Sequence, residues 1–190
     1  MKLQSVRLDI APLGLEELKT FIQSRQLFEK QNGFKLTNQE LHEAYAEELT
    51  ETIQSKPDAW QTSSYIYYTL WLIIERNTKT IIGQFTFNGK PTAKGEVEVF
   101  FSIDSDFRQK GYGCEAMEAI LRWAEKTKPF KVVLIEADLN NKAAMSSLKK
   151  LKFCSIQPDD HVNTKYYKTV CKDKSTDNNL DFDSFSDCYN

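Results

Sequence analysis

The segment Arg108–Gly113 contains the residue types best suited to binding a charged ligand, with the sequence Arg-Gln-Lys-Gly-Tyr-Gly. It follows a predicted strand and precedes a predicted helix. Glycines at such a turn let backbone N–H groups converge on a ligand, and the start of a helix adds positive potential. Arg108 and Lys110 add two cations, although the whole chain has a net charge of −2. We therefore predict a phosphate-binding loop formed by Arg108, Gln109, Lys110, Gly111, Tyr112 and Gly113.

The two glycines also admit other interpretations. A turn that starts a helix needs no ligand, so the glycines alone leave a purely structural role open. A Walker-type loop is excluded because no Gly-Lys-Ser/Thr sequence follows. A dinucleotide-binding fold is disfavoured because the third glycine of its motif would fall at Ala116, and because we expect no parallel β-α-β unit around the loop.

The first third of the chain is predicted to form one strand and two helices. Val6–Ile10 alternates apolar and polar residues as a strand does, and Pro12 is expected to open a helix. Thr37–Glu40 has the spacing of a capping box, so a second helix is predicted to run from Thr37 to Ile53.

The remaining elements are predicted from aromatic, β-branched and helical patterns broken by turns. The predicted strands are Tyr65–Glu75, Thr80–Phe87, Glu96–Ile103, Lys131–Ala137, Phe153–Ile156 and Lys165–Val170. Helices are predicted from Gly111–Gly113 to just before Pro129, and over Asn141–Leu151. The first three of these strands would form an antiparallel meander. The order predicts an α+β (mixed α/β) fold with a mostly antiparallel sheet of about six to seven strands, flanked by about four helices.

Composition limits the classes of function. The net charge gives no basic surface of the kind that nucleic-acid binding needs, and no apolar run is long enough to span a membrane. Four cysteines and two histidines show no metal-ligand spacing, so we expect no metal and a reduced, cytoplasmic protein. We expect one domain over residues 1–170, followed by an acidic, disordered tail over residues 171–190.

Four segments in order resemble the GNAT superfamily of N-acetyltransferases, in particular its RimJ/RimL-like branch. Arg108, Gly111 and Gly113 match the Arg/Gln-x-x-Gly-x-Gly signature that binds the acetyl-CoA pyrophosphate. The other matches are the opening strand Ser5–Leu8, the strand Gly95–Ile103, and the helix and turn from Asn141 to Phe153. The resemblance covers about residues 3–170 and implies the GNAT fold, with a twisted central sheet. It also implies that acetyl-CoA is the co-substrate and that an amine is the acceptor.

The resemblance also assigns roles to residues outside the loop. Strand residues Phe101, Ser102 and Ile103 would bind the pantetheine arm through backbone groups, and Asn141 would belong to the same cofactor site. The backbone N–H of Phe101 would face the thioester oxygen and stabilise the oxyanion. The strand Glu98–Ile103 is then expected to splay from the strand Lys131–Ala137.

One departure from the family bears on catalysis. Many members have a tyrosine at the position of Leu148, where it protonates the departing thiolate, and leucine cannot do so. A thiol with a pKa of about 8.5 is a tolerable leaving group without a general acid, so the departure does not exclude turnover. Water could serve instead, as could Tyr166 or Tyr167, which we expect to be mainly packing residues.

The attacking amine must be neutral, so a general base is expected. Glu98, three residues before Phe101, is the candidate, and Glu96 is the reserve on the same face. Both could instead be solvent-facing carboxylates of an alternating strand. An acidic stripe on the helix Thr37–Ile53 could attract a cationic amine, but we favour an ordinary exposed face; its members are Glu40, Glu43, Glu47 and Glu51.

Three hypotheses therefore stand at the level of sequence. The first is an N-acetyltransferase acting on a primary amine, at a protein N-terminus or on a small molecule, by direct attack in a ternary complex. The second is an acyl-CoA-binding or sensing module without turnover, which Leu148 favours. The third is an interaction protein that uses the acidic tail, which the intact glycines disfavour. The sequence leaves open the acceptor and the oligomeric state, a homodimer included.

Overall fold

The computed structural model describes residues 1–138, 140–156 and 163–170. The chain divides into two compact units. The first comprises Met1–Lys90 and Val99–Ile120, and the second comprises Pro91–Glu98 and the chain from Leu121 onward. The tail predicted over residues 171–190 lies outside the described residues, and the domain boundary at residue 170 stays a prediction.

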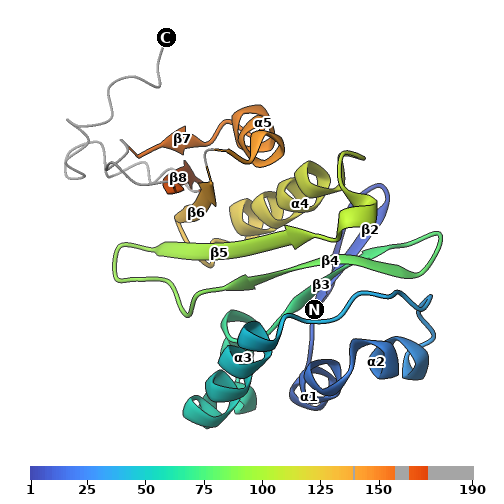
Figure 1. The fold of residues 1–190 in the computed structure, drawn as a ribbon. Helices are drawn as coiled ribbons and strands as arrows, with labels where there is room; N and C mark the ends of the chain where they lie inside the picture. The colour runs from blue at the N-terminus through green and yellow to red at the C-terminus, as the bar shows by residue number, and fades with distance from the viewer. Residues whose placement is uncertain (139, 157–162, 171–190) are drawn as a thin grey trace. The chain divides into compact units, whose positions relative to one another are not determined.

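The described residues form a mixed α+β fold with eight strands and five α-helices (Figure 1). The strands are β1 (Leu3–Gln4), β2 (Leu8–Pro12), β3 (Trp71–Glu75), β4 (Thr80–Phe87), β5 (Glu96–Ile103), β6 (Val132–Asp138), β7 (Cys154–Ser155) and β8 (Asn163–Thr169). The helices are α1 (Leu15–Gln23), α2 (Arg25–Gln31), α3 (Glu43–Ser55), α4 (Tyr112–Thr127) and α5 (Lys142–Lys150). The predicted fold class is confirmed, with β1 and α2 as additional elements.

The first unit is built on an antiparallel sheet in the order β1-β2-β3-β4-β5. The register between β4 and β5 pairs Gly83 with Ile103 and Phe85 with Phe101. The predicted meander of β3, β4 and β5 is therefore confirmed. Gly83 is needed at its position, since an added Cβ would clash with the backbone carbonyl oxygen of Ser102.

Helices α1, α2 and α3 pack on one face of this sheet (Figure 1). Leu18 and Phe21 of α1 are fully buried there, together with Leu49 of α3 and Leu72 of β3. Burying side chains of this size contributes about 1.5–3 kcal/mol each, so this core fixes the helices that lie closest to the sheet.

A buried ionic cluster ties α2 to the end of β5. Arg25, 3% exposed, donates to the carboxylates of Glu29 and Asp104 and to the carbonyl oxygen of Ile81. A buried carboxylate must be fully hydrogen-bonded, and Glu29 obtains two further donors from the backbone and hydroxyl of Thr37. Asp104 follows β5 directly, so the cluster holds the start of the loop that comes after this strand.

Three expectations about the first unit are wrong at the level of element bounds. Thr37 does not cap α3, which begins six residues later, because its donors go to the buried Glu29. Pro12 ends β2 opposite Trp71, and α1 begins at Leu15. The aromatic run from Tyr65 is a 3₁₀ turn at first (Ser63–Tyr67), and strand pairing starts only at Trp71.

The second unit contains β6 between the first part of β5 and β8, with β7 beyond. Glu96–Glu98 of β5 pairs with Val132–Leu134 of β6 in parallel, and β6 pairs with β8 in the antiparallel sense. The expectation of no parallel β-α-β unit around the loop is therefore wrong, since β5, α4 and β6 form one. The third glycine of a dinucleotide motif is still absent at Ala116.

Candidate functional site

The loop after β5 turns the chain sharply into α4. It passes through a 3₁₀ turn (Ser105–Phe107), and Gln109 and Gly111 both have positive φ angles, of 61° and 79°. Alternation of left- and right-handed residues turns successive N–H groups toward one side, which favours anions. The Nε of Arg108 donates to the carbonyl oxygen of Ile103 at 2.9 Å. The rest of this exposed guanidinium remains at the loop surface.

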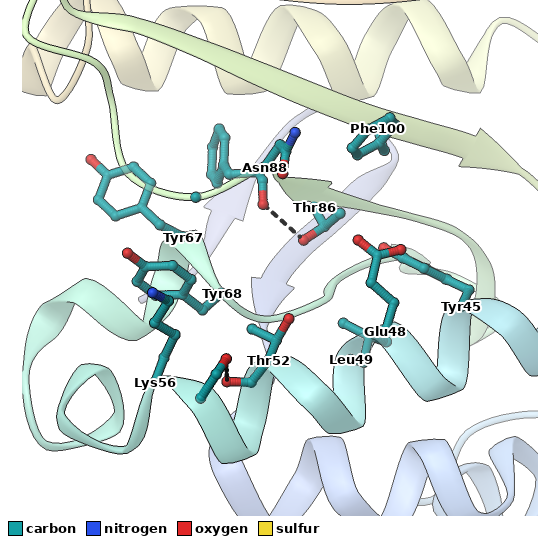
Figure 2. Close-up of a pocket in the computed structure, with 13 residues that line it drawn as sticks. Tyr45, Glu48, Leu49, Thr52, Lys56, Tyr67, Tyr68, Thr86, Asn88 and Phe100 are labelled. Atoms are coloured by element: carbon teal, nitrogen blue, oxygen red, sulfur yellow. Dashed lines mark hydrogen bonds between the residues drawn. The ribbon is translucent and has the colours of Figure 1, made fainter.

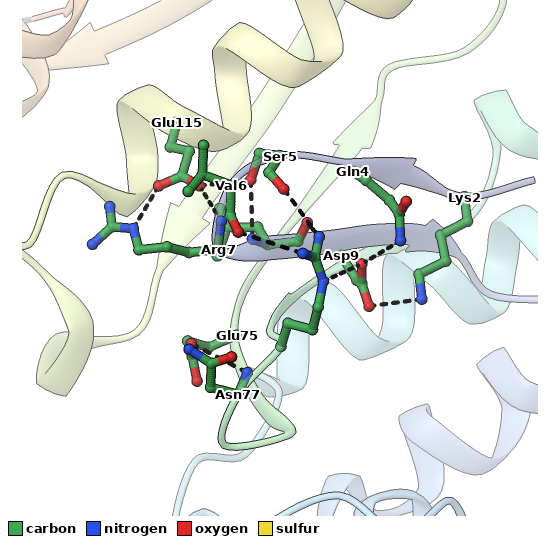
Figure 3. Close-up of polar contacts among 11 residues, drawn as sticks. Lys2, Gln4, Ser5, Val6, Arg7, Asp9, Glu75, Asn77 and Glu115 are labelled. Atoms are coloured by element: carbon green, nitrogen blue, oxygen red, sulfur yellow. Dashed lines mark hydrogen bonds and ion pairs between the residues drawn. The ribbon is translucent and has the colours of Figure 1, made fainter.

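Arg7, which sequence reasoning did not single out, clamps this loop from the N-terminal hairpin (Figure 3). Its Nε lies 2.7 Å from the Glu115 carboxylate, and a terminal nitrogen donates to the carbonyl oxygen of Lys110 at 3.1 Å. The guanidinium also stacks over the Tyr112 ring, 4.2 Å from its centroid. Ser5 donates to the same carboxylate at 2.7 Å. The loop is therefore held by contacts between residues more than 100 positions apart.

The two glycines of the loop have different roles. Gly111 adopts a left-handed conformation, and an added Cβ would meet only a nitrogen of Arg7 at 3.6 Å. Gly113 has no such backbone requirement, and an added Cβ would contact Phe101 and Ile103 at 3.6 and 3.7 Å. Gly111 is therefore needed for the turn, whereas Gly113 leaves space beside β5.

Backbone alternation along β5 fixes the direction of the Phe101 N–H. The amide of Asp104 donates to the carbonyl oxygen of Ile82 on β4 at 2.9 Å. Successive N–H groups of a strand point to opposite edges, so the amides of Ile103 and Phe101 point away from β4. Pairing of β5 with β6 is described only for Glu96–Glu98. The Phe101 N–H is therefore directed to the edge of β5 that β4 does not cover.

The two candidate bases lie on the part of β5 that belongs to the second unit. Glu96 and Glu98 are half-buried, and both alternate with the buried residues Val97 and Val99. Glu96 accepts a long hydrogen bond, 3.4 Å, from the hydroxyl of Thr92, and its amide donates back to that hydroxyl. These contacts connect Glu96, the first residue of β5, to the turn before the strand, while Glu98 lies two residues closer to Phe101 along the strand.

The cofactor and leaving-group candidates on the second unit have clear structural roles. Asn141 is the N-cap of α5, where its side chain accepts a hydrogen bond from the amide of Ala144 at 3.1 Å. Leu148 is only 5% exposed. Tyr166 is buried and its hydroxyl contacts the sulfur of Met145 at 3.3 Å, as expected for a packing residue, and Tyr167 is half-buried.

A pocket of about 220 Å³ lies between α3, the end of β4 and the middle of β5 (Figure 2). We call it the α3 pocket; it is lined by Tyr45, Glu48, Leu49, Thr52, Ser55, Lys56, Tyr67, Tyr68, Thr86, Phe87, Asn88, Gly89 and Phe100. All of these residues belong to the first unit. Burial raises the pKa of Tyr45, although a hydrogen bond with Thr86 opposes the shift, and the charge of Glu48 raises the pKa further. Burial likewise raises the pKa of Tyr67.

Sequence reasoning missed the carboxylate that lines this pocket. The predicted acidic stripe consists of Glu40, which precedes α3, and three glutamates exposed on the helix. Glu48 is the one at the pocket, adjacent to Leu49, which is buried. Glu48 follows Tyr45 by three positions, which places both side chains on one face of a helix, and this spacing could have identified it from the sequence.

In the part of the chain that the structure describes, no group of three or more histidine, cysteine, aspartate or glutamate residues is arranged to hold a metal ion. None of the helices in the described ranges combines the length and the apolar character that a membrane crossing requires.

Comparisons with known proteins point to one family. The model of the acetyltransferase (GNAT) domain matches residues 7–154. An uncharacterized N-acetyltransferase of Bacillus subtilis (strain 168), YjdG, is 28% identical over 83 residues. That match covers 44% of this chain and spans only about half of the relative's length, 49%.

Solved structures share the fold at low identity. A ribosomal-protein-S5-alanine acetyltransferase from Vibrio fischeri aligns with a TM-score of 0.62 at 13% identity, covering 89% of this chain and 96% of that one. RimL, a ribosomal L7/L12 α-N-protein acetyltransferase in complex with coenzyme A, aligns with a TM-score of 0.61 at 14% identity. That alignment covers 89% of this chain and 98% of the other.

Proposed function

Because the chain belongs to the GNAT acetyltransferase domain family, whose model spans residues 7–154, we propose that it transfers an acetyl group from acetyl-CoA to a primary amine. The acceptor attacks directly in a ternary complex of protein, acetyl-CoA and amine. The observation that carries this proposal is the Arg108–Gly113 loop, shaped by Gly111 and clamped by Arg7. Its cations and left-handed turn suit a pyrophosphate.

The residues after Glu98 on β5 would hold the acyl end of the co-substrate. The N–H groups of Phe101 and Ile103 point to the edge away from β4, where they can bind carbonyl oxygens of the pantetheine arm. Ser102 and Asn141 complete the proposed set of cofactor-binding residues. An N–H aimed at the thioester oxygen stabilises the oxyanion and is worth about 100- to 1000-fold in rate.

A base first takes one proton from the ammonium form of the acceptor. The neutral amine nitrogen then attacks the thioester carbon, the C–S bond breaks, and the nitrogen releases its second proton to water. Glu98 is the proposed base, directly or through water, with Glu96 as the reserve. The thiolate takes up a proton from water. A thiol with a pKa of about 8.5 is a good enough leaving group that no general acid is needed at the position of Leu148.

A binding module without turnover is the second candidate, and Leu148 is the observation that favours it. Its apolar side chain is buried, and the hydroxyl of the nearby strand residue Tyr166 is already engaged by Met145. The two candidates agree on cofactor binding and differ only in whether acetyl-CoA is consumed.

One pair of measurements tests the proposal. Calorimetry should show acetyl-CoA binding at low-micromolar concentration with a rise in Tm, since a ligand of the folded state stabilises it by mass action. Release of free thiol from acetyl-CoA with a mixture of primary amines should then exceed the rate without amine. Binding with no amine-dependent release would favour the binding module, and absence of binding would refute both.

A further inference from the structure

The α3 pocket lies one residue along β5 from the proposed oxyanion donor. The ring of Phe100, 45% exposed, lines the pocket, whereas the ring of Phe101 lies on the other side of the strand near Gly113. Side chains alternate across a strand, so the two neighbours serve opposite faces while the Phe101 N–H points along the sheet plane. A ligand in the pocket would therefore contact β5 at the residue next to the reacting thioester.

Glu48 supplies a negative charge at one end of this pocket. It is exposed on α3, and among the described residues no cation lies within ion-pair distance of it. Tyr45 beside it remains a neutral phenol, because burial and the charge of Glu48 both raise its pKa. Figure 2 shows both side chains directed toward Phe100. An ammonium group can therefore be held here next to a hydrogen-bonding phenol.

Lys56 supplies the opposite charge at the other end. It follows α3 as the C-cap residue, eight positions after Glu48, which corresponds to about 12 Å along a helix. Uncharged side chains separate the two charges, among them Thr52 and Tyr68. A linear ligand with a second ammonium group would bring that group toward Lys56, where like charges repel.

The volume limits the size of the occupant. Pockets for drug-sized ligands hold about 300–1,000 Å³, and this one holds about 220 Å³. Its walls carry several aromatic rings, including Tyr67 and Phe87, which suit a short uncharged body.

We propose that the α3 pocket is an acceptor site selective for primary amines with one positive charge on a short uncharged body, and that Glu48 and Lys56 together exclude linear polyamines. The role of the pocket as an acceptor site rests on the proposed acetyl transfer. The binding of an amine in the pocket can be measured independently of that reaction. A free small amine and the first residue of a peptide share this chemistry.

The test combines turnover with binding. Alaninamide represents a free α-amine, an alanine-initiated tetrapeptide amide represents a chain terminus, and putrescine represents a linear polyamine. Thiol release from acetyl-CoA gives kcat and KM for each, and calorimetry on the CoA-saturated protein gives binding without chemistry. We expect kcat/KM for alaninamide or for the peptide to exceed kcat/KM for putrescine by about tenfold or more. Acceptance of the peptide alone identifies a chain terminus as the source.

Two variants and one control assign the selectivity. Glu48→Gln should raise the KM and Kd for the preferred amine about tenfold or more, with the KM for acetyl-CoA unchanged. Glu51→Gln is the matched control, since Glu51 is exposed on α3 but does not line the pocket. Lys56→Glu should raise kcat/KM for putrescine about tenfold relative to kcat/KM for the monoamine.

The outcomes separate this inference from the proposed function. Equal KM and Kd in Glu48→Gln and Glu51→Gln, or a preference for putrescine in the wild-type protein, would overturn the inference and leave acetyl transfer intact. Amine binding that depends on Glu48 without thiol release would support the pocket and refute turnover. If neither alaninamide nor the peptide binds, the inference is overturned directly.

Discussion

Gly111 and Gly113 illustrate how single residues shape the loop after β5. The left-handed backbone of Gly111 costs other residues about 1–2 kcal/mol, whereas Gly113 imposes no backbone requirement. Gly113 instead leaves a methyl-sized space beside Phe101. A sequence motif with two glycines thus combines a turn requirement with a requirement for close approach, and only coordinates distinguish them.

Substitution of each glycine should separate these roles. Gly111→Asp should abolish acetyl-CoA binding in calorimetry, because a side chain strains the turn and a negative charge meets the pyrophosphate. Gly113→Ala should keep the wild-type Tm within a few degrees, yet weaken binding if the phosphate approaches the backbone there. Wild-type affinity in Gly111→Asp would contradict the proposed cofactor site.

Glu98 allows a second prediction at this scale. Glu98→Gln should lower kcat about 100-fold or more with acetyl-CoA affinity nearly intact, because the amide cannot take a proton. The loss should be larger for a lysine-like amine, with a pKa of about 10.4, than for an α-amine near 7.7–8.0. Glu96→Gln is the control on the same face. A loss of kcat confined to Glu96→Gln would assign the role of general base to Glu96. No loss of kcat in either variant would exclude both residues as the base.

Local patterns predicted most elements but not their ends. Strand β5 has the predicted bounds, Glu96–Ile103, because strict alternation and flanking turns define it. The start of α3 could not be predicted, since the donors of Thr37 are taken by a buried carboxylate on another helix. A break at Ser24, whose hydroxyl accepts from the amide of Leu27, divides α1 from α2 and was likewise missed.

The end of α5 places Lys152 in a backbone conformation that favours glycine. Lys152 has a φ of 57°, its amide donates to the carbonyl of Lys149, and the amide of Phe153 donates to that of Leu148. These two bonds form a Schellman motif, in which glycine is favoured at the left-handed position.

Lys152→Gly should therefore stabilise the protein. Relief of the left-handed strain gains about 1–2 kcal/mol, and the greater freedom of the unfolded chain offsets about 0.4–1 kcal/mol of it. Denaturant unfolding should show a net gain of about 0.5–1 kcal/mol. Lys150→Gly, within the last turn of α5, should instead destabilise by about 1 kcal/mol. A loss of stability in Lys152→Gly would contradict the left-handed conformation of Lys152 at the end of α5.

At the scale of the whole molecule, the site depends on contacts that no local pattern encodes. The Arg108–Gly113 motif was predictable from its residues and order. The clamp by Arg7 was not, because its partners lie more than 100 positions away. The α3 pocket was also not predictable, since it requires the spatial meeting of α3, β4 and Phe100.

The clamp predicts a response of stability to acid. Burial alone would raise the pKa of Glu115, but hydrogen bonds from Ser5 and Arg7 and the charge of Arg7 leave it below its usual value. The stabilisation is therefore present above the unfolded pKa of about 4.3 and is lost as pH falls through the lower folded value. The Tm difference between wild type and Glu115→Gln should be largest near neutral pH and shrink below about pH 4. A constant difference would contradict the clamp.

The predicted acidic tail allows a test of domain extent. Truncation after Lys172 should leave the Tm within a few degrees and acetyl-CoA affinity unchanged, because the removed residues are polar and rich in aspartate. A large drop in Tm would show that Phe182, Phe185 or Tyr189 packs on the domain.

The pleat of β5 has a consequence for how this protein can diversify. Phe100 and Phe101 are neighbours in sequence, yet one lines the α3 pocket and the other lies beside Gly113. Under the proposed function, substitutions at Phe100, Tyr45 or Glu48 would change the choice of acceptor, while residues on the opposite face would still bind the co-substrate. An insertion of one residue within β5 would exchange the two faces and disrupt both at once. The proposal therefore implies that specificity can change by point substitution, whereas a change in the length of β5 would disrupt both sites.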